Sequence, residues 1–250
     1  MLQNLTAVVT GSGGGIGKAA ALALARHGAY VIVNDLYPEA AQNVVAEIES
    51  EGGQAYAWPH DVSQEDTIQS LTETINKTTS KLHILVNNAG GGPAGPKAFL
   101  DLAPADWNSM MSITLNSVFY CCQAAIPFML ESKYGRIINI ASTAALRGGG
   151  QNAKSSYATA KAGVIGLTKG VAREFAEQGI CAVALTPCFH ETPAVANWSD
   201  AKKQEVLATI PMKAAGNPAD LAEIIAFLAS RHTKFMTGAV VTVDGGFAMH

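Results

Sequence analysis

Short apolar runs alternate with longer amphipathic segments along almost the whole chain, and this alternation restricts the fold more than any other feature. Several of the runs are apolar at nearly every position, as expected for strands that are buried on both faces. The runs lie at residues 6–10, 30–34, 55–58, 83–87, 136–141, 181–186 and 239–243. Helix candidates lie at residues 15–27, 38–51, 64–79, 104–131, 155–178 and 218–230. The alternation predicts an α/β fold, in which helices cover both faces of a parallel sheet.

Composition excludes several classes of function. The chain has 250 residues and a formal charge of −3, which favours neither nucleic acid nor an anionic membrane surface as a partner. No apolar run reaches the roughly 18 residues of a membrane span, and the N-terminus lacks a basic region and a cleavage-like site. The four cysteines have neither metal-ligand spacing nor the density of a disulfide framework. We therefore expect a cytoplasmic protein with free thiols and no bound metal.

A glycine-rich turn, TGSGGGIG, follows the first apolar run. Its glycines are spaced Gly11-x3-Gly15-x-Gly17 rather than in the common G-x-G-x-x-G pattern, although Gly13 also falls in the turn. Glycine permits tight turning and close approach of the backbone to a pyrophosphate, and the N-terminus of the next helix favours an anion. The turn indicates a dinucleotide site, although a glycine turn alone is not specific for one.

Asp35 ends the second apolar run, 18 residues after Gly17. A carboxylate at this point could accept hydrogen bonds from the ribose hydroxyls of an adenosine and would repel a 2′-phosphate. No Arg or Lys lies in the glycine turn or directly after Asp35. These features favour NAD over NADP. The alternative is that Asp35 only caps a turn at the strand end.

The segment YATAK places Tyr157 and Lys161 four residues apart in a predicted helix, so both side chains lie on one face. A free phenol has a pKa near 10, which is too high for a good base at neutral pH. A nearby ammonium would lower that pKa and make the phenol a proton donor and acceptor for a carbonyl/alcohol pair. A solvated helix face is the alternative for a tyrosine and a lysine at this spacing.

Jointly, the motifs of the chain resemble the short-chain dehydrogenase/reductase family over nearly its whole length. They are TGxxxGIG at 10–17, Asp35, HDV at 60–62, NNAG at 87–90, a serine ahead of YxxxK, a TP…ET loop at 186–192, YGRIINIAS at 134–142 and TGAVVTVDGG at 237–246. The resemblance implies one Rossmann-like, doubly wound domain over residues 1–250, with a seven-stranded parallel sheet. It implies hydride transfer between a nicotinamide cofactor and an alcohol or carbonyl carbon. Similar proteins are usually homotetramers.

The resemblance also implies roles for individual residues. Tyr157 would exchange a proton with the substrate oxygen, Lys161 would lower the pKa of Tyr157 and hold the nicotinamide ribose, and Ser142 would orient the substrate oxygen. The residues implied at the cofactor are Gly11, Gly15, Ile16 and Gly17 at the pyrophosphate, Asp61 and Val62 at the adenine, Asn88, Ala89 and Gly90 on the adenosine side, Pro187 and His190 around the nicotinamide, and Thr192 at the nicotinamide carboxamide or the phosphates.

One departure from the family pattern concerns the catalytic asparagine. The family usually has an asparagine seven residues after a tryptophan, but Trp107 is followed at that spacing by Thr114. Asn116 lies two positions later, and two helical steps rotate a side chain by about 200°, so it should point elsewhere. In the family, that asparagine supports a water that links the lysine to solvent. We therefore expect Thr114 to take the asparagine position and to weaken this water relay from Lys161. If the helix contains a bulge, Asn116 could still serve.

Other departures fall on the substrate side. Ser142 lies 15 residues before Tyr157, where the family more often shows 13, with Thr143 as the weaker candidate for the same role. Gln151, in the lengthened loop, is expected to add a polar contact to the substrate.

The loop after the sixth strand departs as well. Pro187 is followed by Cys188 in place of the usual glycine, and His190 replaces an apolar residue beside the nicotinamide. We expect Cys188 to pack beside the cofactor, with a reactive thiol as the alternative. His190 either contacts the substrate or lies on the loop surface. Residues 187–215 are expected to form a mobile lid, with Trp198 as an apolar wall of the substrate pocket.

The sequence therefore predicts an NAD(H)-dependent oxidoreductase that acts on a secondary alcohol/ketone pair. The alternatives are an NADP(H)-dependent carbonyl reductase and a protein that binds the cofactor without catalysis. Sterols, sugars, cyclic alcohols, acyl thioesters and terpenoids all remain open as substrates. A strongly anionic substrate is less expected, because only Arg147 and Lys154 bring positive charge to the active-site loop.

Overall fold

The computed structural model describes residues 1–91, 96–150 and 154–249. Within these ranges, seven strands form one parallel sheet in the order β3-β2-β1-β4-β5-β6-β7. The strands are β1 (Thr6–Val9), β2 (Tyr30–Asp35), β3 (Gln54–Pro59), β4 (Ile84–Asn87), β5 (Gly135–Ile140), β6 (Ile180–Pro187) and β7 (Val240–Val243). Each strand lies within two residues of a predicted apolar run, and the expected seven-stranded parallel sheet is confirmed.

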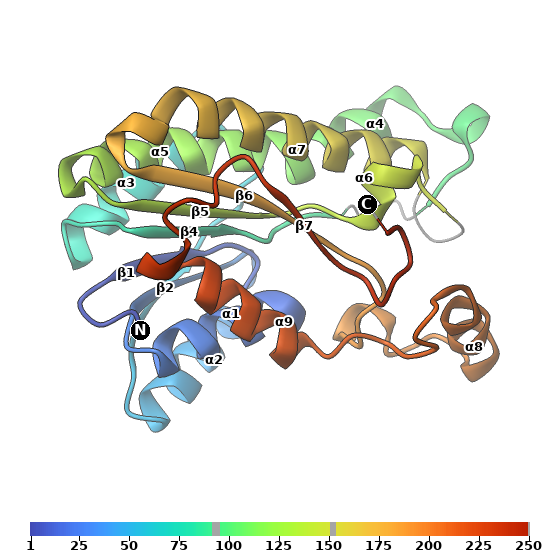
Figure 1. Cartoon of the computed structure of the whole chain (residues 1–250), viewed down its shortest axis with the longest axis horizontal. Helices are drawn as coiled ribbons and strands as arrows, with labels where there is room; N and C mark the ends of the chain where they lie inside the picture. The colour runs from blue at the N-terminus through green and yellow to red at the C-terminus, as the bar shows by residue number, and fades with distance from the viewer. Residues whose placement is uncertain (92–95, 151–153, 250) are drawn as a thin grey trace.

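Helices cover both faces of the sheet (Figure 1). One face carries α1 (Gly15–Arg26), α2 (Pro38–Ser50) and α9 (Pro218–Leu228). The other carries α3 (Thr67–Thr78), α5 (Ser117–Ser132) and α7 (Ser155–Phe175), with α4 (Pro104–Met111) leading into α5. Two shorter helices, α6 (Thr143–Arg147) and α8 (Asp200–Thr209), follow the carboxyl ends of β5 and β6, and Figure 1 shows α8 standing away from the sheet.

The strand order reverses at β1, which lies between β2 and β4. Val8 is paired with Ile32 on one side and with Leu85 on the other. In open α/β sheets, ligands bind in the crevice at the carboxyl ends of the strands where the order reverses. The topology therefore places the glycine turn after β1 and the NNAG segment after β4 side by side at the expected ligand site.

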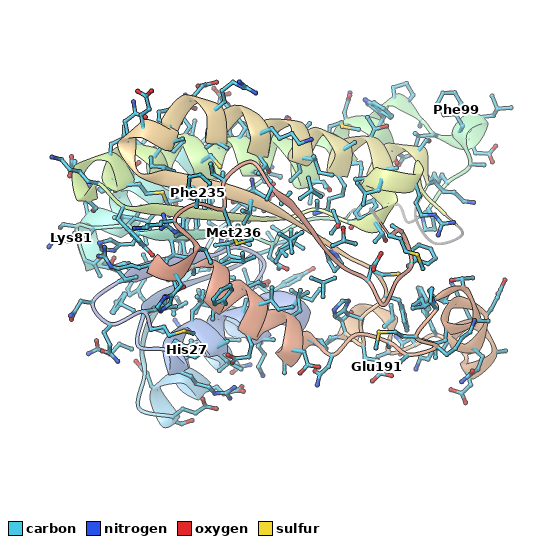
Figure 2. All side chains as sticks on the ribbon, viewed as in Figure 1. His27, Lys81, Phe99, Glu191, Phe235 and Met236 are labelled. Carbon is cyan, nitrogen blue, oxygen red and sulfur yellow. The ribbon has the colours of Figure 1, made fainter. Side chains whose placement is uncertain are left out.

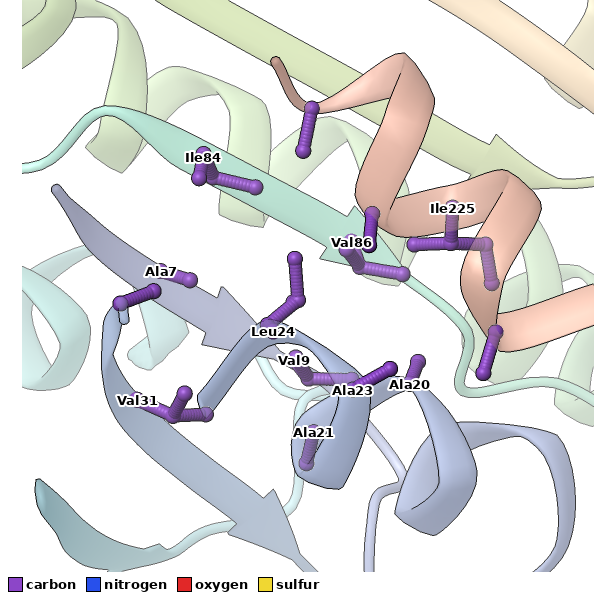
Figure 3. Close-up of a cluster of buried hydrophobic side chains, with 14 of the residues drawn as sticks. Ala7, Val9, Ala20, Ala21, Ala23, Leu24, Val31, Ile84, Val86 and Ile225 are labelled. Atoms are coloured by element: carbon purple, nitrogen blue, oxygen red, sulfur yellow. The ribbon is translucent and has the colours of Figure 1, made fainter. Parts of the chain in front are cut away.

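The core beneath this crevice depends on small side chains in α1. Helices α1 and α9 lie on the same face of the sheet, and Figure 3 shows Leu24 of α1 and Ile225 of α9 in the buried cluster on this face. The labelled members of this buried cluster are Ala7, Val9, Ala20, Ala21, Ala23, Leu24, Val31, Ile84, Val86 and Ile225. Alanines let the helix backbone approach the strands closely, so that the glycine turn is held against the sheet. His27, at the C-cap of α1 (Figure 2), joins α9 through a 2.8 Å contact with Glu223.

The segment predicted as one helix over residues 104–131 is interrupted. A π-helical turn, Ser112–Asn116, separates α4 from α5. Taken as one helix, Pro104–Ser132 is long and apolar enough to cross a membrane, and half of its most apolar window is buried inside the molecule. Its Cys121 and Cys122 lie in the core, and burial raises the pKa of the Cys122 thiol to about 12.

Candidate active site

The glycine turn has a backbone that few other residues can adopt. Gly11 and Gly15 have φ values of +59° and +54°. A Cβ on Gly17 would lie 2.3 Å from the carbonyl oxygen of Gly11 and 2.5 Å from Asn88 Nδ2, so a side chain does not fit there. Helix α1 begins at Gly15 with no side-chain cap and no acidic residue in its first turn. Its N-terminal amides and dipole are therefore available to an anion.

Side chains from two neighbouring strands hold the turn in place. The amide of Asn88, after β4, donates to the carbonyl oxygens of Thr10 and Gly11 at 3.0 and 2.9 Å. The hydroxyl of Thr10 accepts the N–H groups of Asn88 and Ala89 at 3.0 and 3.1 Å. From β2, Asn34 Oδ1 accepts the N–H of Gly11 at 3.3 Å. The turn is thus fixed before any ligand binds, which reduces the entropy lost on binding.

Asp35, at the end of β2, faces the glycine turn. Its Oδ2 accepts the N–H of Gly13 at 2.9 Å, and its Oδ1 accepts the N–H of Tyr37 at 3.1 Å. None of the ion pairs formed by the described residues includes Asp35, and the exposed residues after it are Leu36 and Tyr37. Asp35 therefore accepts turn hydrogen bonds and also presents negative charge beside the turn.

Ser142, Tyr157 and Lys161 meet at the carboxyl end of β5. Ser142 is the N-cap of α6, and its hydroxyl accepts the N–H of Ala144 at 3.1 Å. Tyr157 and Lys161 lie one turn apart on α7, with Lys161 Nζ 5.8 Å from the centroid of the Tyr157 ring. Lys161 is 2% exposed and donates a short hydrogen bond to the carbonyl oxygen of Ile140.

One cavity of about 420 Å³ joins these three side chains to the glycine turn. Its lining includes predicted residues from every part of the site: Gly11, Gly15, Ile16, Asn88, Gly90, Ser142, Tyr157, Lys161, Pro187 and Thr192. It also includes Gly14, Ile140, Ala141 and Pro193, which were not assigned to the cofactor, and Cys188, which was expected to pack beside it. Ile140 and Ala141 directly precede Ser142 in INIAS, and Pro193 follows Thr192, so strand register and loop continuity were the available signals.

Burial sets the protonation of the pair. It raises the pKa of the Tyr157 phenol, and a hydrogen bond with Ser142 opposes that rise. It lowers the pKa of Lys161 to about 8. Lys161 donates its hydrogen bond to Ile140 in this structure, and its predicted lowering of the phenol pKa stays a prediction. Tyr157 is therefore protonated at neutral pH, the form that can donate a proton to a carbonyl oxygen.

Thr114, and not Asn116, faces this site. The helix does contain the bulge that could have brought Asn116 inward, but Asn116 is exposed whereas Thr114 is 0% exposed. Thr114 Oγ1 accepts the N–H of Gly91 at 3.1 Å. A Cβ on Gly90 would lie 2.9 Å from Lys161 Nζ and 3.6 Å from Thr114 Cγ2, so the threonine lies next to Lys161 across the NNAG segment.

The variants Thr114→Val and Asn116→Ala separate the two positions. We expect Thr114→Val to lower the free energy of unfolding by about 1–3 kcal/mol, because the N–H of Gly91 loses its acceptor. Asn116→Ala, on the exposed face, should change it by less than about 0.5 kcal/mol. Urea unfolding at equilibrium measures both. A larger loss for Asn116→Ala would mean that the bulge turns Asn116, rather than Thr114, inward.

A second cavity, of about 400 Å³, adjoins the first on the substrate side. Ser142 and Cys188 line both cavities, and Trp198, 5.5 Å from Phe189 in a stacked arrangement, forms an apolar wall of the second. Val206 of α8 lies on the same wall, so the segment expected to act as a lid borders this cavity. Burial raises the pKa of the Cys188 thiol, which argues against a reactive thiolate.

His190 lines neither of these two cavities, and its contact with the substrate or the nicotinamide stays a prediction. Its side chain is 6% exposed, and its Nδ1 lies 3.2 Å from the carbonyl oxygen of Cys188. Residue 190 forms a parallel bridge with Gly216, where a Cβ would lie 2.4 Å from His190 Nε2. Burial lowers the pKa of this imidazole. The ring fills the space above Gly216 and joins the loop after β6 to the segment before α9.

Other predicted residues lie at the edge of the site or outside the description. Asp61 accepts hydrogen bonds from the N–H of Ser63 and from Gln64, and these bonds lower the pKa of its carboxyl. Val62 is buried, and neither it nor Ala89 lines the Tyr157 cavity. Gln151 lies outside the described residues. Within the described ranges, no group of three or more His, Cys, Asp or Glu side chains could hold a metal ion.

The site has the features that a nicotinamide dinucleotide requires. Its cavity runs from a glycine turn at a helix N-terminus to the Tyr157–Lys161 pair, and Asp35 lies beside the turn. Gly14 leaves open space where a side chain would otherwise project. The residues therefore fit a pyrophosphate at the turn, a ribose beside Lys161 and a reactive ring between Pro187 and Tyr157.

Comparison with known proteins agrees with this geometry. Residues 11–248 match the family model described as Enoyl-(Acyl carrier protein) reductase. The chain is 32% identical over 248 residues to the 3-oxoacyl-(acyl-carrier-protein) reductase of Thermotoga maritima, covering 99% of each chain. It is 38% identical over 246 residues to the cyclohexanol dehydrogenase of an Acinetobacter species, covering 98% of this chain and 95% of the relative. The solved 3-oxoacyl (acyl-carrier-protein) reductase of Agrobacterium tumefaciens, with NADP bound, matches with a TM-score of 0.91 and 31% identity over 98% of this chain and 95% of that one.

Proposed function

Because the chain belongs to the short-chain dehydrogenase/reductase family, we propose that it transfers a hydride between NAD(H) and a secondary alcohol/ketone substrate, with Tyr157 as acid and base. The observation that carries this proposal is the single cavity lined by Ser142, Tyr157, Lys161 and the glycine turn. An alcohol/ketone oxidoreductase needs a proton donor, an orienting hydroxyl and a dinucleotide site in one space, and these residues supply all three.

The residues of this chain divide the work of the reaction. The bound dinucleotide supplies or accepts the hydride. In the reductive direction, the Tyr157 hydroxyl donates its proton to the developing alkoxide while the Ser142 hydroxyl holds that oxygen in place. In the oxidative direction, the phenolate formed at Tyr157 takes the alcohol proton. The Lys161 ammonium stabilises that phenolate electrostatically and offers N–H donors to a ribose.

Asp35 supports the choice of NAD(H). A 2′-phosphate near the turn would meet the Asp35 carboxylate, and neither Leu36 nor Tyr37 after it carries positive charge. On α1, Lys18 is paired with Glu47 at 2.7 Å. An NADP(H)-dependent carbonyl reductase is the second candidate, because the Agrobacterium relative was solved with NADP bound.

Coenzyme choice is tested by a turnover panel that follows the absorbance of the reduced nicotinamide. Cyclohexanol, cyclohexanone and a 3-oxoacyl thioester are offered with both coenzymes in both directions. We expect kcat/KM with NAD(H) to exceed that with NADP(H) by about 10- to 100-fold, and Asp35→Asn to reduce this ratio. Asp101→Asn, at an exposed carboxylate, is the matched control. A preference for NADP(H) in the wild type would refute the role given to Asp35.

The same panel addresses the non-catalytic alternative. A protein that binds coenzyme tightly but turns over none of these substrates would support a binding function instead.

The homotetramer stays a prediction. Light scattering measures the mass of the protein in solution, and this mass gives the number of subunits.

A further inference from the structure

The second cavity combines apolar walls with one cationic side chain. Phe189, Trp198, Val206 and Phe247 supply apolar surface, while Arg147 brings a guanidinium to the same space. Ser142, which faces the reacting oxygen in the proposed function, lies at the boundary with the Tyr157 cavity. A substrate held at Ser142 therefore extends along apolar surface toward a positive charge.

Arg147 is held in place without an acidic partner. Its Cζ lies 4.1 Å from the centroid of the Phe247 ring, and its Nη1 donates to the carbonyl oxygen of Phe247 at 3.4 Å. No ion pair formed by the described residues includes Arg147. Asp244, in the turn that carries Phe247, uses its carboxylate to accept the N–H groups of Gly246 and Ala248 at 2.9 and 2.6 Å. Arg147 thus keeps most of its five N–H donors for a ligand.

From this arrangement we propose that Arg147 binds a carboxylate at the end of the substrate remote from the reacting carbon. The inference rests on the proposed function and adds a substrate class, namely keto acids or hydroxy acids with an apolar body. Arg147 lies five residues after Ser142, which corresponds to a rise of about 7.5 Å along α6. A planar guanidinium stacked on an aromatic ring presents its edge for bidentate binding of a carboxylate.

The inference revises the expectation that an anionic substrate is disfavoured. That expectation rested on the number of basic residues in the active-site loop, and a single arginine is weak evidence for an anionic substrate. The structure gives Arg147 more importance than this count does. The guanidinium lies over the Phe247 ring and lines a cavity whose other walls are largely apolar.

A matched pair of ketones tests the proposal. The probes are 4-oxocyclohexanecarboxylate and (4-oxocyclohexyl)acetate, each compared with its methyl ester, which has the same ring and no charge. We expect wild type to prefer acid over ester by about 10-fold or more in kcat/KM, and to bind the acid more tightly by calorimetry in the presence of coenzyme. In Arg147→Met, the acid-to-ester ratio should fall to about 1, and Arg147→Lys should recover part of it.

The ester serves as an internal reference, so that a general loss of activity cancels in the ratio. Arg173→Met, on an exposed turn near the far end of α7, is the control that should keep the wild-type ratio. An acid-to-ester ratio near 1 in wild type, or one that Arg147→Met leaves intact, overturns the proposal. Absence of turnover with every probe and with every substrate of the coenzyme panel overturns the proposed function instead, and the calorimetric ratio still decides whether Arg147 binds a carboxylate.

Discussion

Replacing Tyr157 with phenylalanine is expected to lower kcat/KM by about 10²- to 10⁴-fold in both directions. The substitution removes only the hydroxyl, which forms a hydrogen bond with Ser142 and which we propose exchanges a proton with the substrate oxygen. The ring remains and still fills its place beside Lys161. Coenzyme affinity, measured by quenching of protein fluorescence, should therefore change by less than about threefold.

Two controls make the Tyr157 result interpretable. Tyr120→Phe removes a hydroxyl from α5, where the ring contacts Phe119 at 5.7 Å between centroids, and should leave kcat/KM unchanged. The unfolding midpoint in urea should be retained in both variants. If Tyr157→Phe keeps full turnover on a substrate that the wild type reduces, Tyr157 is not the acid.

The fold was predictable because its central strands, β2, β1, β4, β5 and β6, are buried along most or all of their length. Runs such as VIV before Asp35 and ILV before Asn87 read as strands without tertiary information, and the glycine turn marks where the chain leaves β1. The Tyr157–Lys161 pair was predictable for a related reason, since residues four apart on a helix must share a face. Both predictions depend only on residues that are close together in the sequence, and for this reason they needed no knowledge of the tertiary structure.

The remaining features depend on contacts between distant segments. His190 is buried because Gly216, 26 residues later, leaves room for its ring. The orientation of Arg147 depends on Phe247, 100 residues away. The π turn at Ser112–Asn116 contains neither glycine nor proline, so the sequence carries no local sign of it. Loop register and tertiary packing determine these features, so they could not be predicted from composition.

Replacing Lys161 with methionine should separate activity from stability. We expect kcat/KM to fall by about 10²- to 10³-fold, because the variant lacks the ammonium that we propose stabilises the Tyr157 phenolate. The same change should make the folded chain more stable at pH 7. A pKa lowered from 10.5 to about 8 corresponds to about 3 kcal/mol of desolvation cost, and losing the hydrogen bond to Ile140 returns about 1 kcal/mol of that gain.

The pH dependence of unfolding identifies Lys161 as the source of this cost. Between pH 8 and 10.5 the unfolded chain still binds the lysine proton and the folded chain has released it, so the stability of wild type should rise with pH in this window. Burial raises the pKa of Tyr157 in the folded chain, so Tyr157 opposes this rise only near and above pH 10, where the unfolded chain loses a phenol proton that the folded chain keeps. Subtracting the profile of Lys161→Met isolates the lysine, and Lys169→Met, at an exposed position of α7, should reproduce the wild-type profile. If Lys161→Met instead lowers stability at pH 7 and the difference between the profiles is flat, the ammonium is better solvated in the folded protein than its burial implies. The charge that we propose for catalysis is then not held at the expense of stability.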